Sequence, residues 1–185
     1  MLHGFRHASL RMIVRKAGVT TGAFYGYFKT KEELFDALVR ESAQTFLENY
    51  LEITREFEKK PGKQQLEEMG TMSTEWMERT IHYLYQHQNA FRLILLHSEG
   101  TRHEDFVHRL VSHEMAATRT FEEALRQVGV TVHSVSPELM HILISGMVTA
   151  FFEIIIHDMP QEKALGYVQD LVEFQKAGWR KLFGI

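Results

Sequence analysis

The sequence predicts an all-α protein with a small N-terminal helix-turn-helix head and a larger α-helical body. Apolar residues recur at helical spacing along most of the 185 residues, and the chain holds only three prolines. No alternating apolar and polar run is long enough to require a strand. We expect the head to comprise residues 1–42 and the body to comprise residues 43–185.

Two short helices joined by a glycine turn are expected first. Ser9 can cap the first helix, Gly18 supplies the positive φ that ends it, and Thr20 can cap the second. The second helix should present Tyr25 and Tyr27 while the phenylalanines beside them turn inward. This arrangement is a helix-turn-helix, whose second helix enters the DNA major groove.

The remaining helices follow in order, separated by proline and glycine. Thr30 can cap a long helix, Lys60-Pro61-Gly62 breaks it, and Pro137 can open a later helix at its first turn. We expect helices over about 31–58, 64–88, 89–97, 104–128, 137–157 and 161–182, with a loop over 129–136. The chain shows no internal repeat and no low-complexity tract.

Composition and charge narrow the classes of function. The absence of cysteine excludes disulfides and thiolate metal sites and suits a cytoplasmic location. The apolar stretch 139–156 is interrupted by polar residues, so we interpret it as a buried helix and expect no membrane partner. Residues 1–40 hold seven Lys/Arg against three acids, whereas acids dominate the rest. That layout is expected if only the head meets phosphates, although ordinary surface charge also produces it.

The string AGVTTGAFYGYFKTKEEL, residues 17–34, resembles the DNA-binding signature of the TetR family of bacterial transcriptional regulators. The turn glycine, the small residues that open the second helix, the Tyr-x-Tyr-Phe run and the Lys-x-Lys-Glu-Glu-Leu continuation occur in order. The resemblance implies a dimeric transcriptional repressor. Residues 1–42 would bind operator DNA, and residues 43–185 would form the dimer and bind a small-molecule effector that releases the DNA. The resemblance implies neither a cofactor nor an enzymatic activity.

The resemblance also assigns DNA-contacting residues. It implies that residues 21–27 form the recognition helix, that Tyr25 reaches a base edge, sugar or phosphate, and that Tyr27 and Lys31 contact phosphates. The full implied set is Arg11, Thr20, Thr21, Gly22, Ala23, Tyr25, Gly26, Tyr27 and Lys31. Gly26 departs from many relatives, which puts a base contact there in doubt and lowers helix propensity by about 1 kcal/mol.

The start of the chain is a larger departure from the family pattern. TetR-like domains have a further helix before the Gly-Phe that stands here as Gly4-Phe5, and only three residues precede it. A mis-assigned start, a fragment and a reduced head are the alternatives; apolar Phe5, Ile13, Phe24 and Phe28, which would pack on such a helix, favour the first two. The rival function is a dimeric ligand-binding or interaction protein that no longer binds DNA because this helix is missing.

The last two helices carry more apolar residues than one buried face needs. Small residues interrupt the first of them and allow close backbone approach. In TetR-like proteins the corresponding helices form a four-helix bundle with the partner subunit, which implies an interface at Leu139, Ile142, Leu143, Gly146, Ala150, Leu171, Phe174 and Trp179. A wholly intramolecular core is the alternative.

Methionine and aromatic residues in the middle helices suggest a pocket for an apolar or aromatic effector. The candidates are Met72, Trp76, Tyr83, Phe91, His97, Glu99, Phe106, Met115 and His141, although core filling is the better explanation for any one of them taken alone. Histidines at positions 103, 108 and 113 are five residues apart and do not align on a helix, so we expect no metal site. Because the sequence lacks a phosphate loop, a nucleophile elbow and cysteine, we expect no enzyme.

Overall fold

The structure is a computed structural model that describes residues 4–69 and 74–185. Its elements are η1 (Phe5–His7), α1 (Leu10–Lys16), α2 (Thr21–Tyr27), α3 (Lys31–Glu58), α4 (Gly62–Glu68), α5 (Thr74–Gln86), α6 (Gln88–His97), α7 (Phe106–Gln127), α8 (Pro137–Ile156) and α9 (Gln161–Phe183). The described residues contain helices and connecting turns but no strand, which confirms the predicted all-α class.

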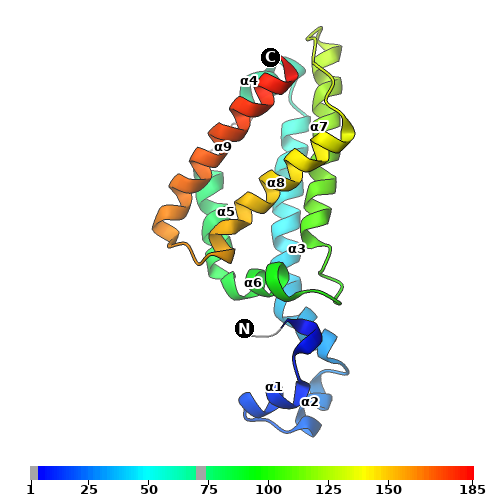
Figure 1. Cartoon of the computed structure of the whole chain (residues 1–185), viewed down its shortest axis with the longest axis vertical. Coiled ribbons are helices and arrows are strands. Elements are labelled where there is room, and N and C mark those ends of the chain that lie inside the picture. Colours follow the sequence, from blue (N-terminus) through cyan, green and yellow to red (C-terminus); the bar gives the residue numbers. More distant parts are fainter. Residues whose placement is uncertain (1–3, 70–73) are drawn as a thin grey trace.

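The head occupies one end of an elongated molecule, and α3 runs from it into the body (Figure 1). The predicted caps at the second and third helices are present: the hydroxyls of Thr20 and Thr30 each accept a hydrogen bond, at 3.0 Å, from the backbone three residues ahead. Gly18 has a φ of +68°, as the turn requires. Ser9 is the N-cap residue of α1, as predicted, but its hydroxyl accepts no hydrogen bond from the helix.

An aromatic cluster fills the end of the body that lies beside the head. Phe46 of α3, Phe91 of α6, Phe106 of α7 and Phe152 of α8 contact one another with ring centroids 5.5–6.3 Å apart. All four are buried. A second apolar cluster at the other end joins α7, α8 and the end of α9 around Leu125. The half-buried Val107 and Val148 pack against both clusters and connect them.

The single helix predicted over 64–88 is wrong, because the structure has two helices, α4 and α5. Met69 has a non-helical backbone, with a φ of −53° and a ψ of 125°, that ends α4, and its side chain is buried in the second cluster. Gly62 brings the start of α4 against α7: a Cβ there would lie 2.5 Å from the carbonyl oxygen of Ala124. Tertiary packing of this short helix therefore overrides the helical periodicity that continues through the sequence.

The predicted start of α8 is confirmed. Pro137 occupies the first turn, and the Ser136 hydroxyl accepts from the backbone of Leu139 at 3.2 Å. The preceding loop is fixed to the C-terminal end of α9, since the backbone amide of His133 donates to the carbonyl of Phe183 at 2.9 Å. This contact holds the start of α8 beside the end of α9.

Candidate nucleic-acid interface

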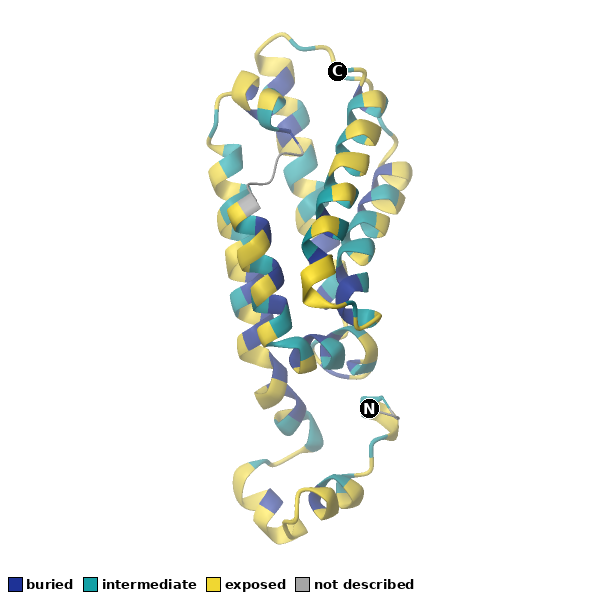
Figure 2. Ribbon diagram, turned by 90° about the vertical axis from the view of Figure 1, so that its left-hand side faces the viewer, coloured by how far each residue is buried: buried dark blue, intermediate teal, exposed yellow. Residues whose placement is uncertain are grey.

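Helix α2 presents a solvent-exposed face of small residues and two tyrosines. Tyr25 and Tyr27 are 56% and 85% exposed, whereas Phe24 between them is buried and packs on Phe28 at 5.6 Å. Figure 2 shows the head as largely exposed apart from such isolated buried positions. The members of the implied set that lie on α2 are all exposed: Thr21, Gly22, Ala23, Tyr25, Gly26 and Tyr27. A helix face with few bulky side chains can approach base edges closely.

Thr20 and Gly26 are constrained differently from the tyrosines. The Thr20 hydroxyl already accepts from the backbone of Ala23, so its role in the structure is to fix the start of α2. No heavy atom lies within 4 Å of where a Cβ on Gly26 would stand, so this glycine leaves open space on the exposed side of the helix. A larger side chain would fit the folded head, and the glycine therefore matters only if something docks on that face.

Four cations of the head are exposed and form no ion pair among the described residues: Arg11, Arg15, Lys16 and Lys29. The other three are engaged. Arg6 pairs with Glu99 at 2.7 Å, Arg40 pairs with Asp36, and Lys31 binds backbone carbonyls. Of these four cations, only Arg11 belongs to the DNA-contacting set that the sequence implied. The excess of positive charge in residues 1–40 was the only sequence signal for the other three. Unpaired cations beside a recognition helix are the groups that neutralise DNA phosphates.

Lys31 is placed differently from the exposed cations. Its ammonium donates to the carbonyl oxygen of Phe5 and, at 3.1 Å, to that of Ala8, and it lies 4.3 Å from the centre of the Phe5 ring. It thereby joins the start of α3 to η1. Phosphate contact by Lys31 stays a prediction, and Lys29, two residues earlier and exposed, is the better-presented charge.

The apolar residues expected to need a further helix find partners within the described chain. Phe5 packs edge-on against Phe35 of α3, with ring centroids 5.5 Å apart. Phe24 is buried, while Ile13 and Phe28 are half-buried. The head thus has a small apolar centre of its own around α1, α2 and the start of α3.

The residues predicted to bind an effector do not gather around one cavity. Phe91 and Phe106 belong to the closely packed aromatic cluster, and Glu99 lies at the head, paired with Arg6. His141 is exposed on α8, with its ring 6.4 Å from that of His108. The remaining described candidates, Trp76, Tyr83, His97 and Met115, are half-buried, and Met72 lies outside the described residues.

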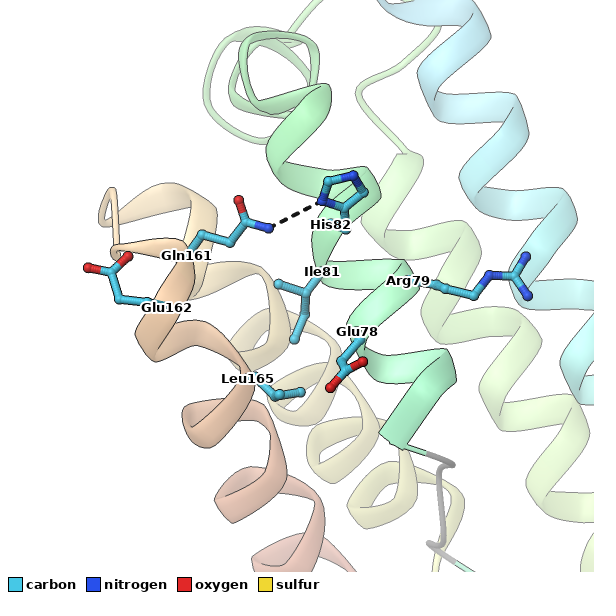
Figure 3. A pocket seen from close by; sticks show the side chains of 7 residues that line it. All are labelled: Glu78, Arg79, Ile81, His82, Gln161, Glu162 and Leu165. Atoms are coloured by element: carbon cyan, nitrogen blue, oxygen red, sulfur yellow. Dashed lines mark hydrogen bonds between the residues drawn. The ribbon is translucent and has the colours of Figure 1, made fainter.

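A cleft of about 700 Å³ instead lies between α5 and α9. Ile81 and Leu165 point into it from the two helices, and the side chains of His82 and Gln161 meet across it at 3.4 Å (Figure 3). Arg79 points away from α9 in the same view. The cleft is open to solvent and shares no residue with the predicted set, so sequence reasoning missed it; nothing in the residue pattern marked these positions.

Helices α8 and α9 expose apolar side chains of the predicted interface. Ile142 is 65% exposed and Phe174 73% exposed, and Leu139 and Gly146 are also exposed. Leu143, Ala150, Leu171 and Trp179 are half-buried, and Trp179 stacks on Phe183 of its own chain. By length and composition alone α8 could also cross a membrane, a test that core and interface helices pass equally.

The body also holds a half-buried acid, Glu114, that no predicted site uses. The Tyr50 hydroxyl of α3 donates to the carboxyl of Glu114 on α7. Burial raises the pKa of Glu114, and burial together with the neighbouring Glu114 raises the pKa of Tyr50. Burial favours the protonated carboxyl of Glu114, whereas the hydrogen bond from Tyr50 favours its ionised form, and the contact joins α3 to α7.

Comparison with known families supports this description of the head. Residues 1–38 match the family model described as bacterial regulatory proteins, tetR family. No solved structure matches the chain with significant similarity. The matched segment contains α1, the glycine turn, α2 and the start of α3, the same residues that carry the resemblance in the sequence. Residues 1–38 therefore form a helix-turn-helix head of the kind that the tetR family model describes.

Proposed function

We propose that the protein is a transcriptional repressor that binds a palindromic operator as a homodimer and releases it when a small-molecule effector binds the body. The tetR-type head supports a transcriptional regulator. The observation that carries DNA binding is the exposed α2 face, where Tyr25 and Tyr27 project from small residues, together with the unpaired cations of α1 and of the segment just after α2. Operator binding places the protein in the cytoplasm.

A second copy of the chain is the partner best suited to the exposed face of α8 and α9. Ile142 and Phe174 are large apolar side chains left in solvent, and Gly146, Gly166 and Gly178 leave open space at the surfaces of the same helices. Small residues next to large ones let two helix pairs approach closely. A dimer formed this way would present two recognition helices to successive turns of one DNA face.

The effector is proposed to be apolar or aromatic. The core of the body includes aromatic and methionine side chains, and the cleft between α5 and α9 has Ile81 and Leu165 on its walls. An effector that stabilises one spacing of the two heads would change operator affinity by its difference in affinity for the two spacings. Its identity does not follow from these residues.

The experiment is a titration of the protein against a duplex containing the DNA upstream of its own gene and against a random duplex of equal length. Fluorescence anisotropy across salt concentrations should give tighter binding to the upstream duplex at every salt. Equal affinity for both duplexes would defeat the repressor. A dimer that binds neither duplex at low salt would instead support the rival, a dimeric interaction protein without DNA binding.

A further inference from the structure

The loop between α6 and α7, residues 98–105, joins the body to the head at a second place besides α3. Helix α3 is the covalent connection and is continuous through the junction (Figure 1). A single helix leaves the head free to swing when the helix bends. The loop contacts η1 through Glu99 and contacts α3 through His103.

Asp36 is the centre of the second connection. Its side chain is only 3% exposed and accepts a hydrogen bond from Nε2 of His103 at 2.8 Å. An ionised carboxylate can only accept, so Nε2 of His103 carries the proton in this contact. Arg40, one turn further along α3, also binds the Asp36 carboxylate, and Arg102 lies 3.8 Å from it. Burying a carboxylate is costly unless such partners are present, so these contacts favour the arrangement in which the loop 98–105 lies against α3.

The loop is itself stiffened, so it can transmit a displacement. The Thr101 hydroxyl donates to the carbonyl of Ser98 at 2.7 Å and accepts from the backbone of His103 at 3.1 Å. The Glu104 carboxylate accepts from the backbone of Gly100 at 2.8 Å. Gly100 has a φ of +81°, and a Cβ there would stand 3.1 Å from the Arg6 side chain. The loop therefore lies directly against η1.

The apolar contacts follow the same path. Phe35, next to Asp36, packs on Phe5 of η1 at 5.5 Å and on the His103 ring at 6.1 Å. The helices on either side of the loop carry Phe91 and Phe106, which touch in the aromatic cluster of the body. A change in the packing of α6 against α7 thus moves the loop that holds the head.

We infer that Asp36 and His103 are positioning residues that latch the head to the body and set the orientation of the recognition helix. Arg40 lies on the same helix as Asp36, so its pairing with Asp36 does not depend on the loop, and the latch can release without leaving the carboxylate unpaired. The exposed Arg6–Glu99 pair is a weaker outer contact of the same latch. The consequence for DNA rests on the proposed function, but the latch itself is measurable without DNA or effector.

The test uses the absence of cysteine from the chain. Spin labels at K16C in α1 and R119C in α7, both exposed positions, report the distance between head and body. An excess of unlabelled protein keeps each labelled pair within one chain. The native protein should give a narrow distribution of distances between the labels. His103→Ala should broaden this distribution, and His103→Gln, whose amide can donate to Asp36, should keep it narrow. His113→Ala, at an exposed histidine of α7, the helix that follows the loop, is the matched control, and its distance distribution should stay narrow.

The outcomes separate the latch from general stability and from DNA binding. A narrow distribution in His103→Ala would overturn the proposal, as would equal broadening in the Ala and Gln variants. If His103→Ala loses its helical circular dichroism, Arg6→Ala decides, because its pair is exposed: broadening supports the latch and a native distribution refutes it. Arg15→Ala, an unpaired arginine of the head, is its control. Failure of operator binding with a narrow distribution would count against the proposed function and leave the latch intact.

Discussion

Lys29 and Lys31 provide the sharpest test of how the head meets DNA, because the structure gives two neighbouring lysines opposite surroundings. Lys29 is exposed with no ion pair among the described residues, and the Lys31 ammonium binds two backbone carbonyls. We expect Lys29→Ala to remove one phosphate contact from each head. In a dimer this flattens the slope of log K against log salt by about 1.8, at about 0.9 for each phosphate.

That slope has a measurable consequence. Between 50 and 200 mM salt, roughly, the affinity advantage of the native protein over Lys29→Ala should shrink about twelvefold, on both the upstream and the random duplex. Lys31→Ala should leave the slope near the native value and instead destabilise the head, since it loses the contacts with Phe5 and Ala8. Fluorescence anisotropy at several salt concentrations measures the first effect, and hydrogen exchange of α1 and α2 amides measures the second.

Lys63→Ala is the matched control, at an exposed lysine of the body, and its slope should be native. A native slope in Lys29→Ala would refute the reasoning from exposure. A slope reduced in Lys31→Ala alone would show that Lys31 leaves its carbonyl partners and moves to a phosphate when DNA binds.

Three further changes test the body. Phe106→Ala should destabilise the fold by about 3–5 kcal/mol in urea unfolding, since a fully packed ring is removed from the aromatic cluster, while exposed Tyr25→Ala stays within about 0.5 kcal/mol. Phe174→Glu should convert the dimer into monomers in sedimentation, whereas the control Glu123→Gln, at an exposed position of α7, should leave the dimer intact. A dimer that persists in Phe174→Glu would show that the interface lies elsewhere. Glu114 has a raised pKa in the folded state, so its contribution to stability is complete below the ordinary carboxyl range and is lost as pH rises through the folded pKa. Glu114→Gln should remove that loss, and identical pH profiles of unfolding free energy would contradict it.

Helix starts could be predicted because their signals are local. The hydroxyls of Thr20, Thr30 and Ser136 accept from backbone amides three residues ahead, so a window of a few residues contains the whole interaction. The end of α4 could not be predicted in the same way. Met69 leaves the helical conformation while its side chain packs on residues of α7 and α8, which are distant in sequence.

The site residues also divide into those set by local sequence and those set by contacts with distant parts of the chain. The exposure of Tyr25 and Tyr27 follows from helical phase, so the sequence placed them on the outer face of α2. The partners of Lys31 and Arg6 depend on where η1 and the loop 98–105 lie, and no periodicity reports that. Aromatic composition likewise cannot distinguish a ligand pocket from a packed core, and in the structure Phe106 belongs to the core.

Helix α6 connects the two surfaces that a regulator has to coordinate. At its start, Gln88 and Arg92 bind the carboxylate of Asp158 in the turn between α8 and α9, and Tyr85 just before it donates to the carbonyl of Met159 at 2.6 Å. At its other end the chain enters the loop that holds the head. A displacement of α6 should therefore reach the proposed dimer face and the head together. Asp158→Ala is expected to shift the head-to-body distance measured with the same spin labels, although the residue lies far from the head along the chain; an unchanged distance would show that the two ends of α6 act independently.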